Sequence, residues 1–428
     1  MNSTWRVSLS CESSWEVNNV TENKNIPRIR FEGFTDPWEQ RKLGENCTFA
    51  KGRGYSKADI RKSGTPLILY GRLYTQYQSR IDIVDTYADM QDDSVLSKGA
   101  EVIVPASGET AEDIAVAASV RSSGILLGGD LNVITPGARI DPDFLALEIT
   151  YGEAHNKLAK CAQGKSVVHI HNEDIADVDF VCPELAEQRT IATTIHNLDS
   201  LIALHQRKYE KLQKLKKSML DKMFPKPGEL YPEIRFEGFT DPWEQRKLGE
   251  VACIVGGGTP NTGIHAYWDG DIDWYSPAEL GERIYADGSV RKITQAGYDS
   301  CSAIMLPANK TILFTSRAGI GNVAILRRPA CTNQGFQSLI VDDDADVYFV
   351  YSMAGAIKKY AEQKASGSTF LEISGKSLAA GEFAFPAKYE QIKIGSAFRC
   401  LDSLITLHQR KLELLKNIKK SLLDRMFV

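Results

Sequence analysis

The chain repeats itself, and this repeat constrains the fold more than any other feature of the sequence. The segment IRFEGFTDPWEQRKLGE at residues 29–45 recurs without change at residues 234–250, which is 205 residues later. Residues 198–224 return as residues 401–427, 203 residues later, with 19 of the 27 aligned positions identical. Between these shared borders the two halves differ widely. The 428 residues therefore predict two tandem halves with a common frame and different interiors.

The shared end of each half predicts a long helix with a coiled-coil seam, because apolar and aromatic residues recur there at alternating steps of four and three. The seam comprises Ile191, Ile195, Leu198, Ile202, Tyr209 and Leu212 in the first half, and Leu401, Ile405, Leu412 and Leu415 in the second. Each helix follows a Pro-x-x-x-Glu-Gln segment that starts at Pro183 or Pro386. One interpretation is that the helices merely pair within a core. The other is that they pair antiparallel around an approximate two-fold axis and hold the two domains apart.

The rest of the chain predicts two mixed α/β (α+β) domains. Short apolar runs bounded by glycine, proline, asparagine and aspartate indicate strands, for example at residues 102–104, 125–127 and 312–314. Helices are expected at 142–148 and 348–358. The predicted boundaries give a polar leader (1–28), a first domain (29–182), a first helix with its linker (183–228), a second domain (229–385) and a second helix (386–428).

Composition excludes several classes of site. The sequence has no run of eighteen apolar residues and its leader lacks the apolar segment of a signal peptide, so we expect a cytoplasmic protein with no membrane partner. Eight cysteines are scattered without a Cys-x-x-Cys pair, which argues against a zinc site or a disulfide framework. The formal net charge of −4 means that any contact with nucleic acid must come from local basic patches.

No motif in the sequence indicates an enzyme. The glycines at 256–258 lack the Gly-Lys-Ser/Thr sequence of a phosphate-binding loop, and no Asn/Asp-Pro-Pro-aromatic motif of an adenine methyltransferase is present. Pro142-Asp143 is followed by Glu148-Ile149-Thr150, which lacks the lysine of a common metal-dependent nuclease. We therefore expect a non-catalytic chain that binds no cofactor or metal of its own.

The order of motifs in the two domains resembles that of a known family. The first domain carries KGRGYSKADI (51–60), YGRLYT (70–75) and AQGKSVVHI (162–170); the second carries GGGTPNTG (256–263), YWDGDIDWYSPAEL (267–280), SRAGIGNVAI (316–325), TNQGFQ (332–337) and ASGSTFLEIS (365–374). Followed each time by the shared helix, this order is similar to the target-recognition domains of specificity subunits in Type I restriction-modification systems. The resemblance covers nearly all of residues 29–428.

The resemblance implies a function and a set of partners. Each domain would read one half of an interrupted site in double-stranded DNA, and the helices would form an antiparallel coiled coil that sets the spacing. Two methyltransferase subunits would dock on this frame, and restriction/motor subunits would join them. These partners, rather than this chain, would bind S-adenosylmethionine, ATP and Mg.

Basic, aromatic and amide side chains in the variable segments are the candidates for DNA contact, because phosphates attract cations and base edges pair with arginine, asparagine or glutamine. They are Lys51, Arg53, Tyr55, Lys57, Arg72, Tyr74 and Arg80 in the first domain, and Arg317, Asn333, Gln334, Lys364, Ser366, Ser368 and Thr369 in the second. Such residues are also typical of a solvated surface. Two alternative functions stay open: an interaction scaffold whose variable domains bind proteins or sugars, and an enzyme with a degenerate site.

Overall fold

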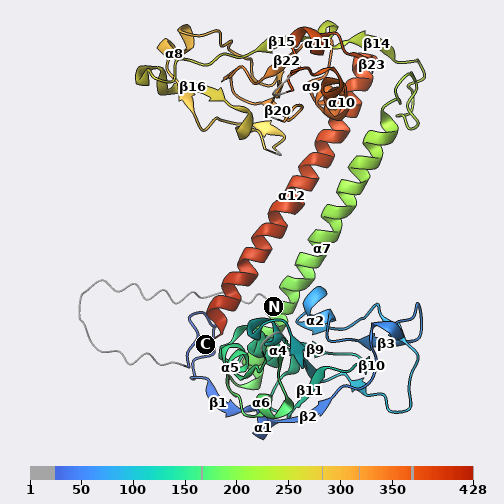
Figure 1. The fold of residues 1–428 in the computed structure, drawn as a ribbon, viewed down its shortest axis with the longest axis vertical. Helices are drawn as coiled ribbons and strands as arrows, with labels where there is room; N and C mark the ends of the chain where they lie inside the picture. Colours follow the sequence, from blue (N-terminus) through green and yellow to red (C-terminus); the bar gives the residue numbers. More distant parts are fainter. Residues whose placement is uncertain (1–24, 165–166, 282, 318, 368–370, 428) are drawn as a thin grey trace. The chain divides into compact units, whose positions relative to one another are not determined.

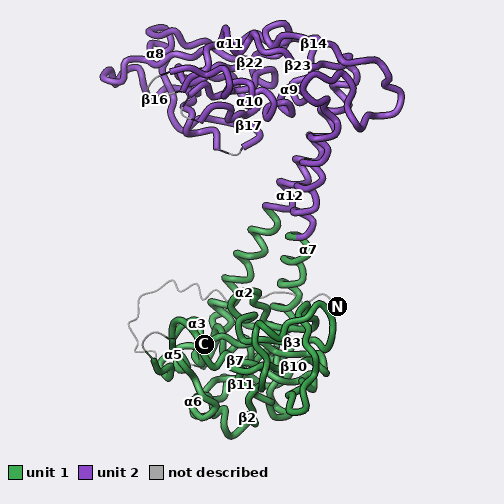
Figure 2. The backbone as a smooth tube through the Cα atoms, turned by 45° about the vertical axis from the view of Figure 1, so that its right-hand side comes forward, with its two compact units in different colours: residues 1–206, 410–428 green, residues 207–409 purple. Residues whose placement is uncertain are grey.

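The computed structural model describes residues 25–427 except 165–166, 282, 318 and 368–370. The chain divides into two compact units (Figure 2): unit 1 contains Met1–Gln206 and Arg410–Val428, and unit 2 contains Arg207–Gln409. Both divisions fall inside long helices, α7 (Leu185–Met223) and α12 (Lys388–Met426). Each unit therefore contains one stretch of each helix. Most of the predicted leader, residues 1–24, lies outside the described residues.

Unit 1 is built on a five-stranded sheet of order β2-β11-β7-β9-β4, antiparallel except for the parallel pair β4 and β9, and a four-stranded sheet of order β5-β3-β10-β6. Its strands are β1 (Glu39–Lys42), β2 (Cys47–Lys51), β3 (Thr65–Ile68), β4 (Arg80–Ile81), β5 (Tyr87–Ala88), β6 (Leu96–Lys98), β7 (Glu101–Pro105), β8 (Ser107–Gly108), β9 (Ala118–Val120), β10 (Ser123–Leu127), β11 (Leu131–Pro136), β12 (Val168–His169) and β13 (Asp179–Cys182). Its shorter helices are α1 (Leu43–Asn46), η1 (Lys57–Asp59), α2 (Arg72–Thr75), α3 (Ala111–Ile114), α4 (Pro142–Tyr151), α5 (Glu153–Cys161) and α6 (Asn172–Ala176).

Unit 2 has a five-stranded sheet of order β15-β22-β19-β20-β17 and a three-stranded sheet of order β18-β16-β21. Its strands are β14 (Glu244–Lys247), β15 (Ala252–Gly256), β16 (Trp268–Tyr275), β17 (Tyr285–Ala286), β18 (Lys292–Ile293), β19 (Thr311–Phe314), β20 (Val323–Leu326), β21 (Cys331–Thr332), β22 (Gln337–Val341) and β23 (Glu382–Phe385). Its shorter helices are η2 (Leu248–Glu250), η3 (His265–Tyr267), η4 (Pro277–Glu279), α8 (Gln295–Asp299), α9 (Val347–Ser352), α10 (Ala354–Lys364) and α11 (Gly375–Ala379).

The two five-stranded sheets share one topology although their sequences differ. Strands β2, β11, β7, β9 and β4 correspond in order to β15, β22, β19, β20 and β17, and the last pair is parallel in both units. The mixed α/β class is therefore confirmed, and the strands predicted at 102–104, 125–127 and 312–314 are present in β7, β10 and β19. The helix predicted over 348–358 is two helices, because the chain turns at Met353 (φ −80°, ψ −1°), between α9 and α10.

The prediction of two long helices is also confirmed, and each begins two residues after the repeated proline, Pro183 or Pro386. Unit 1 combines the first part of α7 with the last part of α12, and unit 2 combines the last part of α7 with the first part of α12. The helices therefore run antiparallel within each unit (Figure 1). Of the predicted seam, Ile191, Ile195, Leu401 and Leu412 are buried, and Leu198, Ile202, Tyr209, Leu212, Ile405 and Leu415 are partly buried.

Two ion pairs extend the seam at equivalent positions. The Lys419 ammonium lies 2.5 Å from Asp199 in unit 1, and the Lys216 ammonium lies 2.6 Å from Asp402 in unit 2. Each pair joins α7 to α12, and the members correspond at the 203-residue offset of the repeat. A lysine in an apolar seam is stable only where a carboxylate compensates its charge, so these pairs favour one alignment of the helices over others.

An aromatic triad anchors the paired helices in each unit. In unit 1 Phe427, directly after α12, stacks on Phe144 of α4 at 5.8 Å between ring centroids and meets Trp38 edge-on at 6.3 Å. The equivalent triad of unit 2 consists of Phe224, Phe349 and Trp243, whose ring centroids lie 5.4–5.9 Å apart. In both units the phenylalanine that follows the end of one long helix thus packs into the core of the unit that contains the start of the other long helix.

Candidate nucleic-acid interface

Both units present a loop at the same place, directly after the first strand of the five-stranded sheet. A Cβ atom on Gly52 would lie 2.0 Å from the carbonyl oxygen of Gly128, and one on Gly257 would lie 2.2 Å from that of Asn333. These pairs correspond at an offset of 205 residues. Only glycine allows so close an approach, so both loops leave the sheet along the same path. Beyond these glycines, the first loop reads RGYSK and the second GTPNTG.

The first loop exposes three of the predicted cations. Lys51 ends β2, Arg53 follows Gly52, and Lys57 begins η1. Arg53 has a side chain 66% exposed, and its guanidinium lies 4.0 Å from Asp93. Tyr55 on the same loop has a positive φ of 59° and its hydroxyl lies 2.5 Å from the Ser94 hydroxyl, which fixes the loop. The structure thus brings Lys51, Arg53, Tyr55 and Lys57 together.

Two other predicted cations of unit 1 are held by carboxylates. The Arg72 guanidinium lies 2.7 Å from Asp85, and this pair holds the pKa of Asp85 below its usual value. Arg80 donates to both carboxylate oxygens of Asp82 and to Asp143, and the bond to Asp82 raises the pKa of Arg80. These guanidinium groups are therefore less available to phosphates than the cations of the first loop.

The predicted aromatic candidate Tyr74 has a structural role. Its hydroxyl donates to the carbonyl oxygen of Ser107 at 2.8 Å, and burial raises its pKa. Its contact with DNA stays a prediction.

In unit 2 the predicted residues gather around the turn that follows β21. The hydroxyl of Thr259, on the glycine-rich loop, donates to Gln334, and Asn333 accepts from the backbone N–H of Gly335 at 2.8 Å. The Ser316 N–H donates to the carbonyl oxygen of Gly335 at 2.8 Å, which places the neighbouring Arg317 against the same turn. Arg317, Asn333 and Gln334 therefore form one cluster beside the loop.

The remaining candidates of unit 2 lie on the segment after α10. Lys364 is the exposed last residue of this helix, and Ser366 pairs through its backbone with Glu372. Glu372 also lies 3.9 Å from the Arg317 guanidinium, so Ser366 is near that cluster. Ser368 and Thr369 lie outside the described residues.

Sequence reasoning missed a stripe of exposed leucine and isoleucine along each long helix. The side chains, 39–59% exposed, are Leu201, Leu204 and Leu215 on α7, and Leu404, Leu407, Leu414 and Ile418 on α12. Leu201, Leu404 and Leu414 each precede a seam position by one residue. Three pairs repeat at the 203-residue offset, namely Leu201 with Leu404, Leu204 with Leu407, and Leu215 with Ile418. This spacing was available in the sequence. Repeated exposed apolar side chains on a helix are typical of a surface that another protein covers.

The described residues contain no group of three or more histidine, cysteine, aspartate or glutamate side chains arranged to hold a metal ion. Within the same residues, no helix is both long and apolar enough to cross a membrane.

Comparisons with known proteins agree with this arrangement. A family model described as a Type I restriction modification DNA specificity domain matches residues 35–214 and again residues 240–417. The Type I restriction enzyme MjaIX specificity subunit of Methanocaldococcus jannaschii is 36% identical over 190 residues, which are 44% of this chain and 44% of that protein. The MjaX specificity subunit of the same organism is 23% identical over 420 residues, covering 94% and 96%. The chain thus aligns with under half of the first relative and nearly all of the second.

A solved structure shares the fold. The crystal structure of the S subunit of a Type-I restriction-modification system from M. genitalium superposes with a TM-score of 0.61 at 16% sequence identity, over 94% of this chain and 99% of that one. The two chains therefore share one fold over most of their length.

Proposed function

This chain belongs to the family of Type I restriction-modification DNA specificity domains, and on this premise we propose that its two units each read one half of an interrupted site in double-stranded DNA. The observation that carries the proposal is the pair of loops after β2 and β15. Each loop leaves its sheet at the same point, at Gly52 or Gly257, but the side chains that follow differ between the two loops. A shared frame with different loops suits the reading of two different half-sites, because base edges are read by individual side chains.

In unit 1 we infer that Lys51, Arg53 and Lys57 bind phosphates and that Tyr55 keeps their loop in place. In unit 2 we infer that Arg317, Asn333 and Gln334 approach base edges, because guanidinium and amide groups form paired hydrogen bonds with guanine and adenine. The chain itself is non-catalytic in this account.

We further propose that the long helices set the spacing between the half-sites and that two methyltransferase subunits dock on them. The exposed apolar stripes of α7 and α12 support this, since their positions repeat with the repeat of the chain. Two equivalent surfaces suit two copies of one partner. Restriction/motor subunits join this core in the cytoplasm, and S-adenosylmethionine, ATP and Mg are bound by the partners.

The test is methylation sequencing of DNA from cells that express this chain with its cognate methyltransferase subunit. We expect an interrupted motif to be modified on both strands only when both proteins are present. Methylation by this chain alone would favour the enzyme alternative. A stable complex with an active methyltransferase that produces no new modified motif would favour the scaffold alternative.

A further inference from the structure

The loops that follow β2 and β15 differ in charge. The first carries Lys51, Arg53 and Lys57, whereas unit 2 has no lysine or arginine from residue 248 to residue 282, a range that includes its whole glycine-rich loop (residues 256–263). Proteins hold double-stranded DNA chiefly through cations that contact its phosphates. If both units bind DNA at these loops, a cation from another part of unit 2 must lie beside the glycine-rich loop.

Arg291 is such a cation. It directly precedes β18, and its carbonyl oxygen accepts a hydrogen bond from the Trp274 N–H of β16 at 3.2 Å. This pairing places the two side chains side by side, because residues directly opposite each other on two antiparallel strands share a face. The guanidinium carbon of Arg291 lies 3.9 Å from the ring centroid of Trp268 and 5.7 Å from that of Trp274.

The same two tryptophans hold the glycine-rich loop. The indole N–H of Trp274 donates to the carbonyl oxygen of Gly258 at 2.8 Å, and that of Trp268 donates to the carbonyl oxygen of Asn261 at 3.3 Å. The two rings meet edge-on with their centroids 5.2 Å apart, and both side chains are buried. Arg291 therefore stacks on a fixed pair of rings that are bonded directly to the loop.

The glycine-rich loop also connects this arginine to the cluster proposed to read bases. The Gly258 N–H donates to the carbonyl oxygen of Thr332 at 2.9 Å, and the hydroxyl of the next residue, Thr259, donates to Gln334. The loop is thus bonded both to the tryptophans beneath Arg291 and to the turn that carries Gln334. Phosphate contacts near base-reading side chains fix how DNA lies against them.

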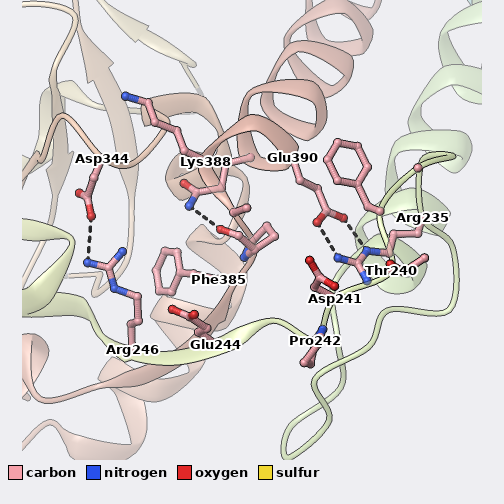
Figure 3. Close-up of a pocket in the computed structure, with 15 residues that line it drawn as sticks. Arg235, Thr240, Asp241, Pro242, Glu244, Arg246, Asp344, Phe385, Lys388 and Glu390 are labelled. Carbon is pink, nitrogen blue, oxygen red and sulfur yellow. Dashed lines mark hydrogen bonds and ion pairs between the residues drawn. The ribbon is translucent and has the colours of Figure 1, made fainter.

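Several other cations of unit 2 are paired with carboxylates. Figure 3 shows two such pairs near the start of α12, where Arg235 lies 2.7 Å from Glu390 and Arg246 lies 3.1 Å from Asp344. The first of these pairs is bidentate, since the guanidinium donates to both carboxylate oxygens. Cations held in this way are already compensated, so they are poorly suited to bind a phosphate.

The Arg291 guanidinium is not compensated in this way. Its side chain is exposed, and in the described part of the chain no carboxylate lies within 4.0 Å of it, those of Asp269 and Asp271 on β16 included. The next cation along the strand, Lys292, by contrast lies 3.5 Å from Asp273. A guanidinium that stacks on an aromatic ring keeps its N–H groups at its edge, where a phosphate can accept them.

We propose that Arg291 binds a DNA phosphate beside the glycine-rich loop, and so supplies to unit 2 the charge that unit 1 carries within its own loop. The inference rests on the proposed function and deepens it, because it names a residue that fixes DNA on unit 2 without reading a base. Trp268 and Trp274 are positioning residues in this account. They hold the arginine in place before DNA arrives, which lowers the entropy that binding costs.

The test measures how tightly the complex of the full chain with its methyltransferase subunit binds two fluorescent duplexes, from about 50 to about 200 mM salt. One duplex carries the motif found by methylation sequencing, and the other has the same length without the motif. Arg291→Met removes the charge but keeps a flexible apolar side chain over Trp268. We expect it to weaken binding of both duplexes about tenfold and to reduce the slope of log affinity against log salt by about one.

Two further variants separate charge from packing. Arg291→Lys keeps the charge and should retain the salt slope, whereas a merely structural role would make the lysine and methionine variants equally defective and would overturn the inference. Arg327→Met is the matched control, because the Arg327 guanidinium also stacks on an aromatic ring, Tyr285 at 3.7 Å, but has Asp287 at 3.8 Å. The control should bind both duplexes as the unmodified chain does.

Three results would contradict the inference in different ways. Unchanged affinity and salt slope in Arg291→Met would reject it outright. A methylated motif that changes in this variant would mean that Arg291 reads a base rather than a phosphate. Failure of the unmodified complex to prefer the duplex with the motif would instead reject the proposed function, and the inference with it. The inference alone fails if the unmodified complex prefers the motif and the methionine variant matches it.

Discussion

Phe427→Ala is expected to destabilise unit 1 by about 3–5 kcal/mol, the range for removal of a buried phenylalanine. Phe427 is 8% exposed and lies against Phe144 and Trp38. Truncation leaves a cavity between the two rings and releases the last turn of α12 from the core of unit 1. The paired parts of α7 and α12 in this unit should then open more often.

Hydrogen exchange followed by mass spectrometry measures this locally, which matters because a chain of two units need not unfold in one step. Exchange should accelerate in residues 410–426 and 185–206. Phe224→Ala is the matched variant, because Phe224 has the equivalent place in unit 2, and it should accelerate exchange in residues 207–223 instead. Equal acceleration in both units from either variant would contradict separate anchoring.

Glu148→Met is expected to stabilise unit 1 by about 2–3 kcal/mol at pH 7, because folding must keep this buried carboxyl group protonated at a pH where the unfolded chain ionises it. Glu148 on α4 is fully buried, and neither carboxyl oxygen accepts a hydrogen bond of good geometry from the described residues. Burial raises its pKa to about 8, and the nearby backbone N–H groups of Ala154 and Val181 offset this only in part. The equivalent position of unit 2, 205 residues later, holds the buried Met353.

Glu148→Met should also remove a pH dependence from the stability of unit 1. A raised pKa means that folded unit 1 binds a proton that the unfolded chain releases near its ordinary pKa of 4.5. The stability of unmodified unit 1 is therefore highest below that value and falls as the pH rises through about 8. Hydrogen exchange at pH 5.5 to 8.5, corrected for intrinsic rates with an unstructured peptide, reports this slope. Met353→Glu should transfer it to unit 2, and an unchanged slope in Glu148→Met would contradict the assignment.

The repeated segments of the sequence predicted the architecture that the two units share, because these segments contain aromatic residues that hold the long helices in place. Trp38 and Trp243 lie in the unchanged segments, and Phe224 and Phe427 end the repeated helices. Contacts that recur at a fixed offset can be expected from the repeat alone. The same reasoning would have found the ion pairs of Lys216 and Lys419.

Which basic residues are free to bind a phosphate could not be predicted from composition. Arg80 is held by Asp143, 63 positions along the chain, through a contact that exists only once α4 packs beside β9. Arg53 on the neighbouring loop stays exposed.

The most direct test of separate half-site reading is methylation sequencing with a chimera in which residues 46–182 come from another specificity subunit of this family. The account predicts a modified motif in which one half is new while the other half and the spacer length are retained. A motif changed in both halves, or retained in both, would contradict the claim that each unit reads its own half-site.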